Sequence, residues 1–200
     1  MTSSLHPEPP PNFNRISLPL KKIRIPILRI FRIGEPPIFF GKSGNNRFDA
    51  PDKEYSILYA GRDEFCAFIE TFGHTTGYNF ITQEEIEERG MIKIKLKQTL
   101  HLVDLTGHGL AQIGADNRLC SGDNIQIAQV WALALFNHHM KPDGIWYRPR
   151  HDPARFAAAV FDRAKNKLNK KPVILVNKFS SSEHKALLAK LLDHYSFGLM

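Results

Sequence analysis

Arg47, Tyr59 and Glu70 are the residues whose types and spacing in this sequence could support chemistry at one site. They lie within the stretch RFDAPDKEYSILYAGRDEFCAFIE, with apolar residues between them. Arginine binds phosphate oxygens through a planar, two-pronged guanidinium group. Tyrosine can stack on a ligand ring or pack a pocket wall, and an ionised carboxylate can stabilise developing positive charge. The three residues are candidates for one ligand site, with unrelated surface positions as the alternative.

The segment around Glu70 is typical of a short helix that begins after Asp63. Its large apolar residues fall on one side at helical spacing, namely Phe65, Phe68, Ile69 and Phe72. Glu70 falls on the opposite side with Cys66 and Ala67, where a glutamate is usually solvated. These small neighbours would nevertheless let a ligand approach the helix. Arg47 follows two asparagines in a predicted turn, where arginine usually serves solubility.

The N-terminal part of the chain is predicted to contain a tail and a broken strand. Residues 1–20 are rich in proline and poor in large apolar residues, so we expect a disordered tail. Residues 21–200 then form one domain, which ends in a strand and a helix. The stretch KIRIPILRIFRI alternates basic and apolar residues as a half-buried strand does, but Pro26 confines it to a sheet edge or breaks it in two.

The later elements predict an α+β fold, because strands and helices do not alternate as in a doubly wound sheet. In the strand YSILYAG, Ile57 and Tyr59 point to one face and Leu58 to the other. Further predicted strands are IKIKL, LHLVDL, GIWYRPR, AAAVFD and KKPVILVN. Ser121 or Asp123 begins the helix in SGDNIQIAQVWALALFNHH, and a capping box begins the C-terminal helix in SSEHKALLAKLLDHY. The expected buried stripe of the first helix is Ile127, Val130, Trp131, Ala134 and Leu135.

The composition indicates one cytoplasmic domain without a metal. The 200 residues are 42% hydrophobic and 24% charged, enough for one sizeable core. Cys66 and Cys120 have no spacing that predicts a disulfide or a zinc site, and His138 and His139 end a helix. No apolar run is long enough to span a membrane, and no signal peptide is evident. The formal charge of +7 suits a nucleic acid, a polyanionic small molecule or an acidic protein.

Several stretches of the chain resemble the RES-domain family, which is named for its arginine, glutamate and serine. They run from about Arg29 to about Asp162 and read LRIFR, FFGKSGNNRFDAP, SILYAGRDEFCAFIETF, LVDLTGHGLAQIGAD, SGDNIQIAQ and DGIWYRPRHD. Members of this family resemble ADP-ribosyltransferases in fold and include NAD-degrading toxins of bacterial toxin–antitoxin pairs. The resemblance implies an ADP-ribosyltransferase-like mixed sheet core with surrounding helices, NAD as the substrate, and an Xre-type antitoxin protein as the partner.

The resemblance also implies roles for individual residues. The expected catalytic residues are Glu70, Arg47 and Tyr59. The expected dinucleotide-binding residues are Arg29, Arg47, Tyr59, Ser121 and Arg150. The chain departs from the family at Pro149, because the family segment that matches IWYRPR commonly reads Y-x-S-R. Proline supplies neither the hydroxyl of that serine nor a backbone N–H.

The resemblance implies an enzyme that cleaves the nicotinamide–ribose bond of NAD, by hydrolysis or phosphorolysis, and inhibits growth as a toxin. Nicotinamide leaves as a neutral ring and needs no acid, while the ribose gains positive charge that an ionised Glu70 can stabilise. Arg29 and Arg47 suit the pyrophosphate of the dinucleotide.

Two other functions stay open. Pro149 allows a catalytically impaired RES-type domain that serves protein interaction. The basic first strand, with Lys165, Lys167, Lys170 and Lys171, allows a nucleic-acid-binding module. If the chain is an NAD-degrading toxin, it is expected to contact nucleic acid only through the antitoxin.

Overall fold

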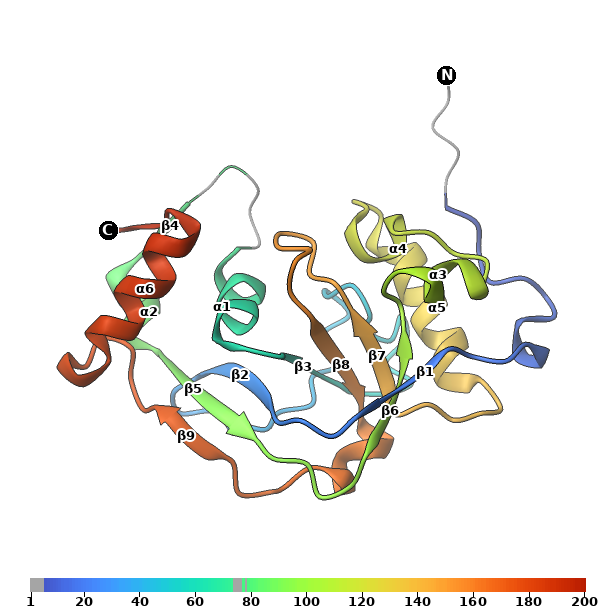
Figure 1. Cartoon of the computed structure of the whole chain (residues 1–200), viewed down its shortest axis with the longest axis horizontal. Helices are drawn as coiled ribbons and strands as arrows, with labels where there is room; N and C mark the ends of the chain where they lie inside the picture. Colours follow the sequence, from blue (N-terminus) through green and yellow to red (C-terminus); the bar gives the residue numbers. More distant parts are fainter. Residues whose placement is uncertain (1–5, 74–76, 78) are drawn as a thin grey trace.

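The computed structural model describes residues 6–73, 77 and 79–200. Its main sheet contains β1 (Leu20–Ile23), β2 (Ile27–Arg32), β3 (Ile57–Gly61), β5 (Arg89–Ile94), β6 (Leu100–Asp104), β7 (Gly144–Tyr147), β8 (Ala157–Phe161) and β9 (Val173–Val176). The strand order is β1-β6-β7-β8-β3-β2-β5-β9 (Figure 1), and neighbours are antiparallel except for the parallel pair β6 and β7. A separate parallel pair joins β4 (Phe80–Ile81) to β10 (Gly198–Leu199).

The α-helices lie on one side of the sheet in the view of Figure 1. They are α1 (Glu64–Phe72), α2 (Gln83–Glu87), α3 (His108–Gln112), α4 (Arg118–Ser121), α5 (Ile125–Asn137) and α6 (Lys185–Tyr195), and short 3₁₀ helices cover Phe13–Arg15, Asp162–Lys167 and Ser182–His184. Helix α1 stands between the pair α2 and α6 and the group α3 to α5. One mixed sheet with helices around it confirms the predicted α+β class.

The Pro-rich N-terminal segment packs on the domain from residue 6 onward. Phe13 and Leu18 are each only 4% exposed. The indole N–H of Trp131 in α5 donates to the carbonyl of Pro7 at 2.8 Å. This packing differs from the expected disordered tail, because two large apolar residues are enough to bury the segment against α5. Residues 1–5 of the expected tail lie outside the described part of the chain.

Pro26 separates β1 from β2, so the basic N-terminal stretch is broken into two strands, which is one of the two predicted outcomes. Strand β1 is an edge strand that pairs only with β6, whereas β2 lies inside the sheet between β3 and β5. In β3 the predicted faces are confirmed. Ile57 and Tyr59 pack with the core under α5, and Leu58 packs with the core on the other face of the sheet.

The helix ends differ from the predicted ones. Helix α5 begins after Asn124, whose side chain accepts the N–H groups of Gln126 and Ile127, and not after Ser121 or Asp123. Its buried residues are Ala128, Gln129, Trp131, Ala132 and Leu135, so the stripe is rotated and Val130 is exposed. Helix α6 follows a 3₁₀ turn and has no side-chain cap, so the expected capping box is wrong there. A capping box instead begins α2, between Thr82 and Glu85.

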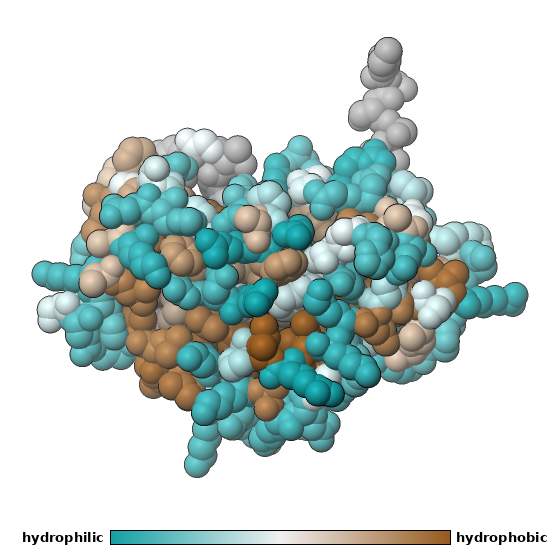
Figure 2. Space-filling model, in the orientation of Figure 1, coloured by the Kyte–Doolittle hydropathy of each residue, from teal (hydrophilic) through white to brown (hydrophobic). Residues whose placement is uncertain are grey.

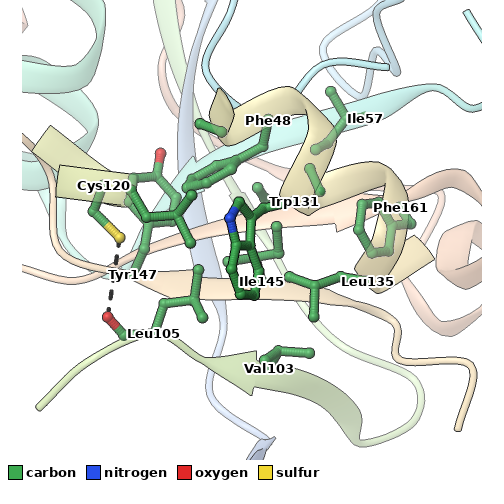
Figure 3. Close-up of a cluster of buried hydrophobic side chains, with 14 of the residues drawn as sticks. Phe48, Ile57, Val103, Leu105, Cys120, Trp131, Leu135, Ile145, Tyr147 and Phe161 are labelled. Carbon is green, nitrogen blue, oxygen red and sulfur yellow. Dashed lines mark hydrogen bonds between the residues drawn. The ribbon is translucent and has the colours of Figure 1, made fainter. Parts of the chain in front are cut away.

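The core is divided by the sheet into separate clusters. Under α5, the side chain of Trp131 packs among Phe48, Ile145 and Tyr147, with Tyr147 at the edge of the group beside Cys120 (Figure 3). A further cluster packs α1 and α6 against β2 and β5. At the outer edge of the sheet, β9 exposes Ile174. Figure 2 shows a hydrophobic region at the lower left of this face of the molecule.

Candidate functional site

A cavity of about 620 Å³ lies against α1 and strands β2, β3, β5 and β7, a volume typical of small-molecule sites. Its polar side chains include Arg29, Arg47, Tyr59, Glu70, Tyr147 and Arg150. Segments that are far apart in the sequence therefore meet at one hollow. Of the residues expected to form the site, Ser121 is not among the described residues that line this cavity.

Helix α1 is packed on more than one side, and this packing holds Glu70 at the cavity. Ala67 and Phe68 pack in one cluster with residues of β2 and α6. Cys66 and Ala67 also lie close to Gly61 of β3, and Ile69 is buried as well. The side of α1 that was predicted to lie opposite the apolar stripe is therefore also covered at Cys66 and Ala67. The close approach depends on Gly61 in β3, where an added Cβ would lie 2.6 Å from the backbone nitrogen of Ala67.

The Glu70 carboxylate is half-buried and accepts a short hydrogen bond from the hydroxyl of Tyr147 in β7. Burial raises the pKa of Glu70, while the Tyr147 hydrogen bond and the charge of Arg47 oppose that shift. Burial and the nearby carboxylate raise the pKa of Tyr147 well above its usual value, so its hydroxyl stays a donor. The sequence did not single out Tyr147. Its only signal was the tyrosine at the start of the matched Y-x-S-R segment.

Arg47 extends from the loop that precedes β3 toward the same carboxylate. Its Nη1 donates to the carbonyl of Gly122 at 2.8 Å. Burial lowers the pKa of Arg47, and the positive charge of Arg150 adds to this effect, whereas Cys120, Tyr147 and Glu70 act in the opposite direction. The guanidinium keeps further N–H donors after the bond to Gly122, since arginine carries five. It is therefore placed to bind an anion beside Glu70.

The loop that carries Arg47 is fixed by the buried carboxylate of Asp49. One Asp49 oxygen accepts the Tyr59 hydroxyl at 3.0 Å, and the other accepts the Ser43 hydroxyl at 2.7 Å and both nitrogens of Asn46. The Tyr59 hydroxyl also accepts the backbone N–H of Phe48 at 3.0 Å. Tyr59 thus uses its hydroxyl to hold the loop, a role that the sequence did not distinguish from ring stacking on a ligand.

Helix α5 holds the same loop from the other side. The buried side-chain amide of Gln129 donates to the carbonyls of Gly44 at 2.7 Å and Asn46 at 3.0 Å. Asp49 and Gln129 were both missed in the sequence, where a polar residue in a turn or in an amphipathic helix is ordinarily solvated. The D of the RFD turn was the only local signal for Asp49.

Arg29 lines the cavity at the point where β2 separates from β3. The two strands pair only through Leu28 and Gly61. The Nη1 of Arg29 donates to the carbonyl of Tyr59 at 2.8 Å, so the side chain satisfies a backbone acceptor beside the short ladder. Burial lowers the pKa of Arg29, and the charge of Arg89 lowers it further, whereas Glu35 raises it.

The other expected ligand-binding residues differ in their surroundings. Arg150 lines the cavity and pairs with the exposed carboxylate of Asp123 at 2.6 Å. The hydroxyl of Ser121 donates at 2.9 Å to the carbonyl of Asn117, the residue that precedes α4. Pro149 is buried two residues after the end of β7.

The histidine pair and Lys167 have structural contacts of their own. His138 is buried with its Nε2 3.2 Å from the carbonyl of Phe13, and burial lowers its pKa. Lys167 donates to the buried carboxylate of Asp143 at 2.7 Å. Among the residues described, no group of three or more His, Cys, Asp or Glu side chains could hold a metal ion. Within the same residues, no helix is both long and apolar enough to cross a membrane.

The fold is a mixed α+β domain, and its cavity combines arginines with a half-buried carboxylate. Residues 26–184 match the RES domain family, and the chain belongs to that family. It is 28% identical over 116 residues to the probable toxin y4kH of Sinorhizobium fredii, across 58% of this chain and 87% of that protein. It also matches a chain in the crystal structure of the M. tuberculosis MbcT-MbcA toxin-antitoxin complex, with a TM-score of 0.61 and 15% identity over 86% of this chain and 91% of that chain.

The burial of Glu70 predicts a pH-dependent cost to stability. Burial gives Glu70 a higher pKa in the folded state than in the unfolded state. The carboxyl group therefore stabilises the fold at pH values below its unfolded-state pKa, and this stabilisation is lost as the pH rises through its folded-state pKa. We expect Glu70→Gln to match the parent in Tm at pH 4 and to exceed it at pH 7.5. Each kcal/mol relieved corresponds to about 2–4 °C for a domain of this size.

Thermal unfolding between pH 4 and 8 tests this expectation. Glu64→Gln is the matched control, since Glu64 lies on the same helix and pairs with Lys190 at the surface at 3.3 Å. The control should show no gain at pH 7.5. A lower Tm for Glu70→Gln than for the parent at pH 7.5 would contradict the assigned cost of burial.

Proposed function

We propose that this protein binds NAD in the cavity, cleaves its nicotinamide–ribose bond, and acts as a growth-inhibiting toxin. The observation that carries the proposal is the half-buried carboxylate of Glu70 beside Arg47 in one cavity. Family membership and the toxin named among the relatives support the biological role.

The reaction breaks the bond between the nicotinamide nitrogen and the anomeric carbon of the ribose. The electron pair of that bond goes to the nitrogen, which cancels the positive charge of the ring. The anomeric carbon gains positive charge, as in glycoside cleavage. Water, or a phosphate oxygen, then forms the new bond to this carbon, and a water nucleophile releases its extra proton to solvent. No general acid is needed for the leaving group.

Glu70 stabilises this charge in its ionised form. A carboxylate that is already held in position in a half-buried site costs no reorganisation when charge develops next to it. The Tyr147 hydroxyl fixes one carboxylate oxygen and favours the charged form. The other oxygen stays available for a ribose hydroxyl or for the developing charge.

Arg47 holds the phosphate nearest the reacting ribose. Its pairing with the Gly122 carbonyl uses one of its donors, and Asp49, Tyr59 and Gln129 set the position of its loop. Such indirect anchoring matters because a displacement of about 1 Å at a binding group can cost on the order of a hundredfold in rate. We assign Tyr59 and Asp49 to positioning.

Pro149 removes the hydroxyl that the family commonly has at this position. The loss of one orienting hydrogen bond costs about 1 kcal/mol, and more if the bond forms only in the transition state. We therefore expect a slower enzyme than one with serine, with the Glu70 and Arg47 parts of the mechanism intact.

An antitoxin protein of the Xre type is the proposed partner. The likeness to a chain of a toxin-antitoxin complex supports this proposal. Such a partner would suppress the activity by covering the mouth of the cavity.

Nicotinamide release from NAD by the purified chain tests the proposed reaction. We expect release by the parent, faster release by Pro149→Ser, and at least a hundredfold loss in Glu70→Gln, the size seen when one electrostatic group is removed from an active site. Glu64→Gln, on the outer side of α1, should retain the parent rate. Equal rates for Glu70→Gln and the parent would contradict the mechanism, and no release by the parent or by Pro149→Ser would contradict the reaction.

The pH dependence of kcat distinguishes the loss of the Tyr147 hydrogen bond from a general loss of structure. This bond lowers the pKa of Glu70 against the effect of burial. Without the hydroxyl the pKa rises, so less Glu70 is ionised at a given pH. In Tyr147→Phe the acid limb of kcat should therefore move to higher pH, with recovery toward the parent value at alkaline pH.

Tyr55→Phe is the matched control for that profile. The Tyr55 hydroxyl donates to the carbonyl of Phe48 at 2.8 Å within the core, and Tyr55 does not appear in the cavity lining. This variant should lose stability and leave the acid limb unmoved. If the acid limb of kcat does not shift in Tyr147→Phe, the hydrogen bond does not lower the pKa of Glu70 as assigned.

A further inference from the structure

The loop between β7 and β8 brings Arg150 and His151 to the cavity. It covers residues 148–156, and both of these side chains line the cavity. Arg150 pairs with Asp123 at 2.6 Å, but the Asp123 side chain is 92% exposed. An ion pair with so exposed a partner contributes little to holding the guanidinium in place. The position of Arg150 therefore depends on the contacts that hold the backbone of its loop.

Asp152 makes most of these contacts. Its side chain is only 14% exposed. One carboxylate oxygen accepts the backbone N–H of Ala154 at 3.1 Å. The other oxygen accepts the hydroxyl of Tyr195 at 2.8 Å and the Nε–H of Arg155 at 3.3 Å. Because Tyr195 is the last residue of α6, Asp152 connects the loop to the C-terminal helix.

Arg155 extends these contacts to α1. Its Nη1 lies 3.3 Å from one carboxylate oxygen of Asp63, while the other oxygen caps α1 by accepting the backbone N–H of Cys66 at 2.8 Å. The guanidinium also lies over the ring of Phe65 in α1, 4.6 Å from its centroid. The loop, the start of α1 and the end of α6 are therefore joined by one group of polar contacts.

Packing holds Tyr195 in the orientation that this hydrogen bond needs. Its ring is stacked parallel to that of Phe68 in α1, with the centroids 5.8 Å apart. Leu188 and Leu191 of α6 are buried in the same cluster as Phe68. Burial and the Asp152 carboxylate raise the pKa of Tyr195, so its hydroxyl stays a donor. Tyr195 is therefore a fixed donor beside the loop.

We propose that Tyr195 and Asp152 are positioning residues, which set the place of Arg150 at the cavity. The identity of the ligand that Arg150 would bind rests on the proposed function, whereas the connection from α6 to the loop does not. Helix α6 follows residues 26–184, the part of the chain that matches the RES domain family. The positioning therefore comes from a segment that lies outside the family match.

Tyr195→Phe tests the positioning role, because it removes the hydroxyl and keeps the ring. In nicotinamide release from NAD, we expect KM to rise about three- to tenfold, since one hydrogen bond to a charged group is lost while Arg155 still pairs with Asp152. The value of kcat should stay at that of the parent, because the contact between Glu70 and Tyr147 is intact.

A second substitution separates positioning from a general loss of structure. In an Arg150→Gln background, Tyr195→Phe should have no further effect on KM, because the side chain that it positions is gone. Lys190→Gln is the control on the same helix, since Lys190 pairs with Glu64 at the surface, and it should leave KM unchanged. A fall in kcat without a rise in KM, or an equal rise in KM with and without Arg150, would overturn the proposal.

Amide hydrogen exchange keeps this test apart from that of the proposed reaction. The backbone N–H groups of Ala154 and Arg155 both donate to Asp152 at 3.1 Å. We expect Tyr195→Phe to speed the exchange of these amides and to leave β3 at the parent rate, with no change in Lys190→Gln. If the parent releases no nicotinamide, the proposed reaction fails, and the exchange result alone decides whether Tyr195 holds the loop. Unchanged exchange at these two amides would overturn the inference.

Discussion

The hydrogen bond from the Tyr147 hydroxyl to the Glu70 carboxylate is the contact on which the cavity depends. It joins α1 to β7 and holds a charged group where burial would otherwise favour its neutral form. A buried hydroxyl without a partner and a buried carboxylate without a donor would each be costly, and their pairing satisfies both. The rest of the site is arranged around this pair.

The structure supports the site with a set of loop contacts that do not themselves face a ligand. Asp49 is 1% exposed, yet it accepts hydrogen bonds from Tyr59, Ser43 and Asn46. Both oxygens of this buried carboxylate are hydrogen-bonded, so Asp49 ties the loop to Tyr59 without leaving a buried charge unpaired. Within the described residues, the buried Nε atoms of Arg29 and Arg89 have no hydrogen-bond partner, so the cavity wall is less fully hydrogen-bonded than the loop beside it.

Much of the fold could be predicted from the sequence, because side chains along a strand point alternately to its two faces, so apolar residues recur at every second position when one face is buried. This holds for β3, where the separate faces of Ile57, Leu58 and Tyr59 were predicted correctly. The packed N-terminal segment could not be predicted, since two apolar residues among prolines do not show which surface will cover them. The rotated stripe of α5 had a similar cause, because that helix is apolar on several sides and tertiary packing selects the face.

Several residues that line the cavity could be predicted from the sequence, whereas their contacts with one another could not. Arg29, Arg47, Tyr59, Glu70 and Arg150 could be named in advance, and the structure places them around one cavity. The surroundings of Glu70 could not be foreseen from helix periodicity, because they depend on the packing of α1 against β3 at Gly61 and on the contact with Tyr147. Tyr147 had only the tyrosine of the matched Y-x-S-R segment as a signal, and its contact with Glu70 is evident only in the folded chain.

The most direct test is a crystal structure of the Glu70→Gln protein with intact NAD. The account predicts that the anomeric carbon of the nicotinamide ribose lies against residue 70, with a phosphate of the dinucleotide on Arg47. NAD bound outside the cavity, or with its nicotinamide ribose away from residue 70, would contradict it.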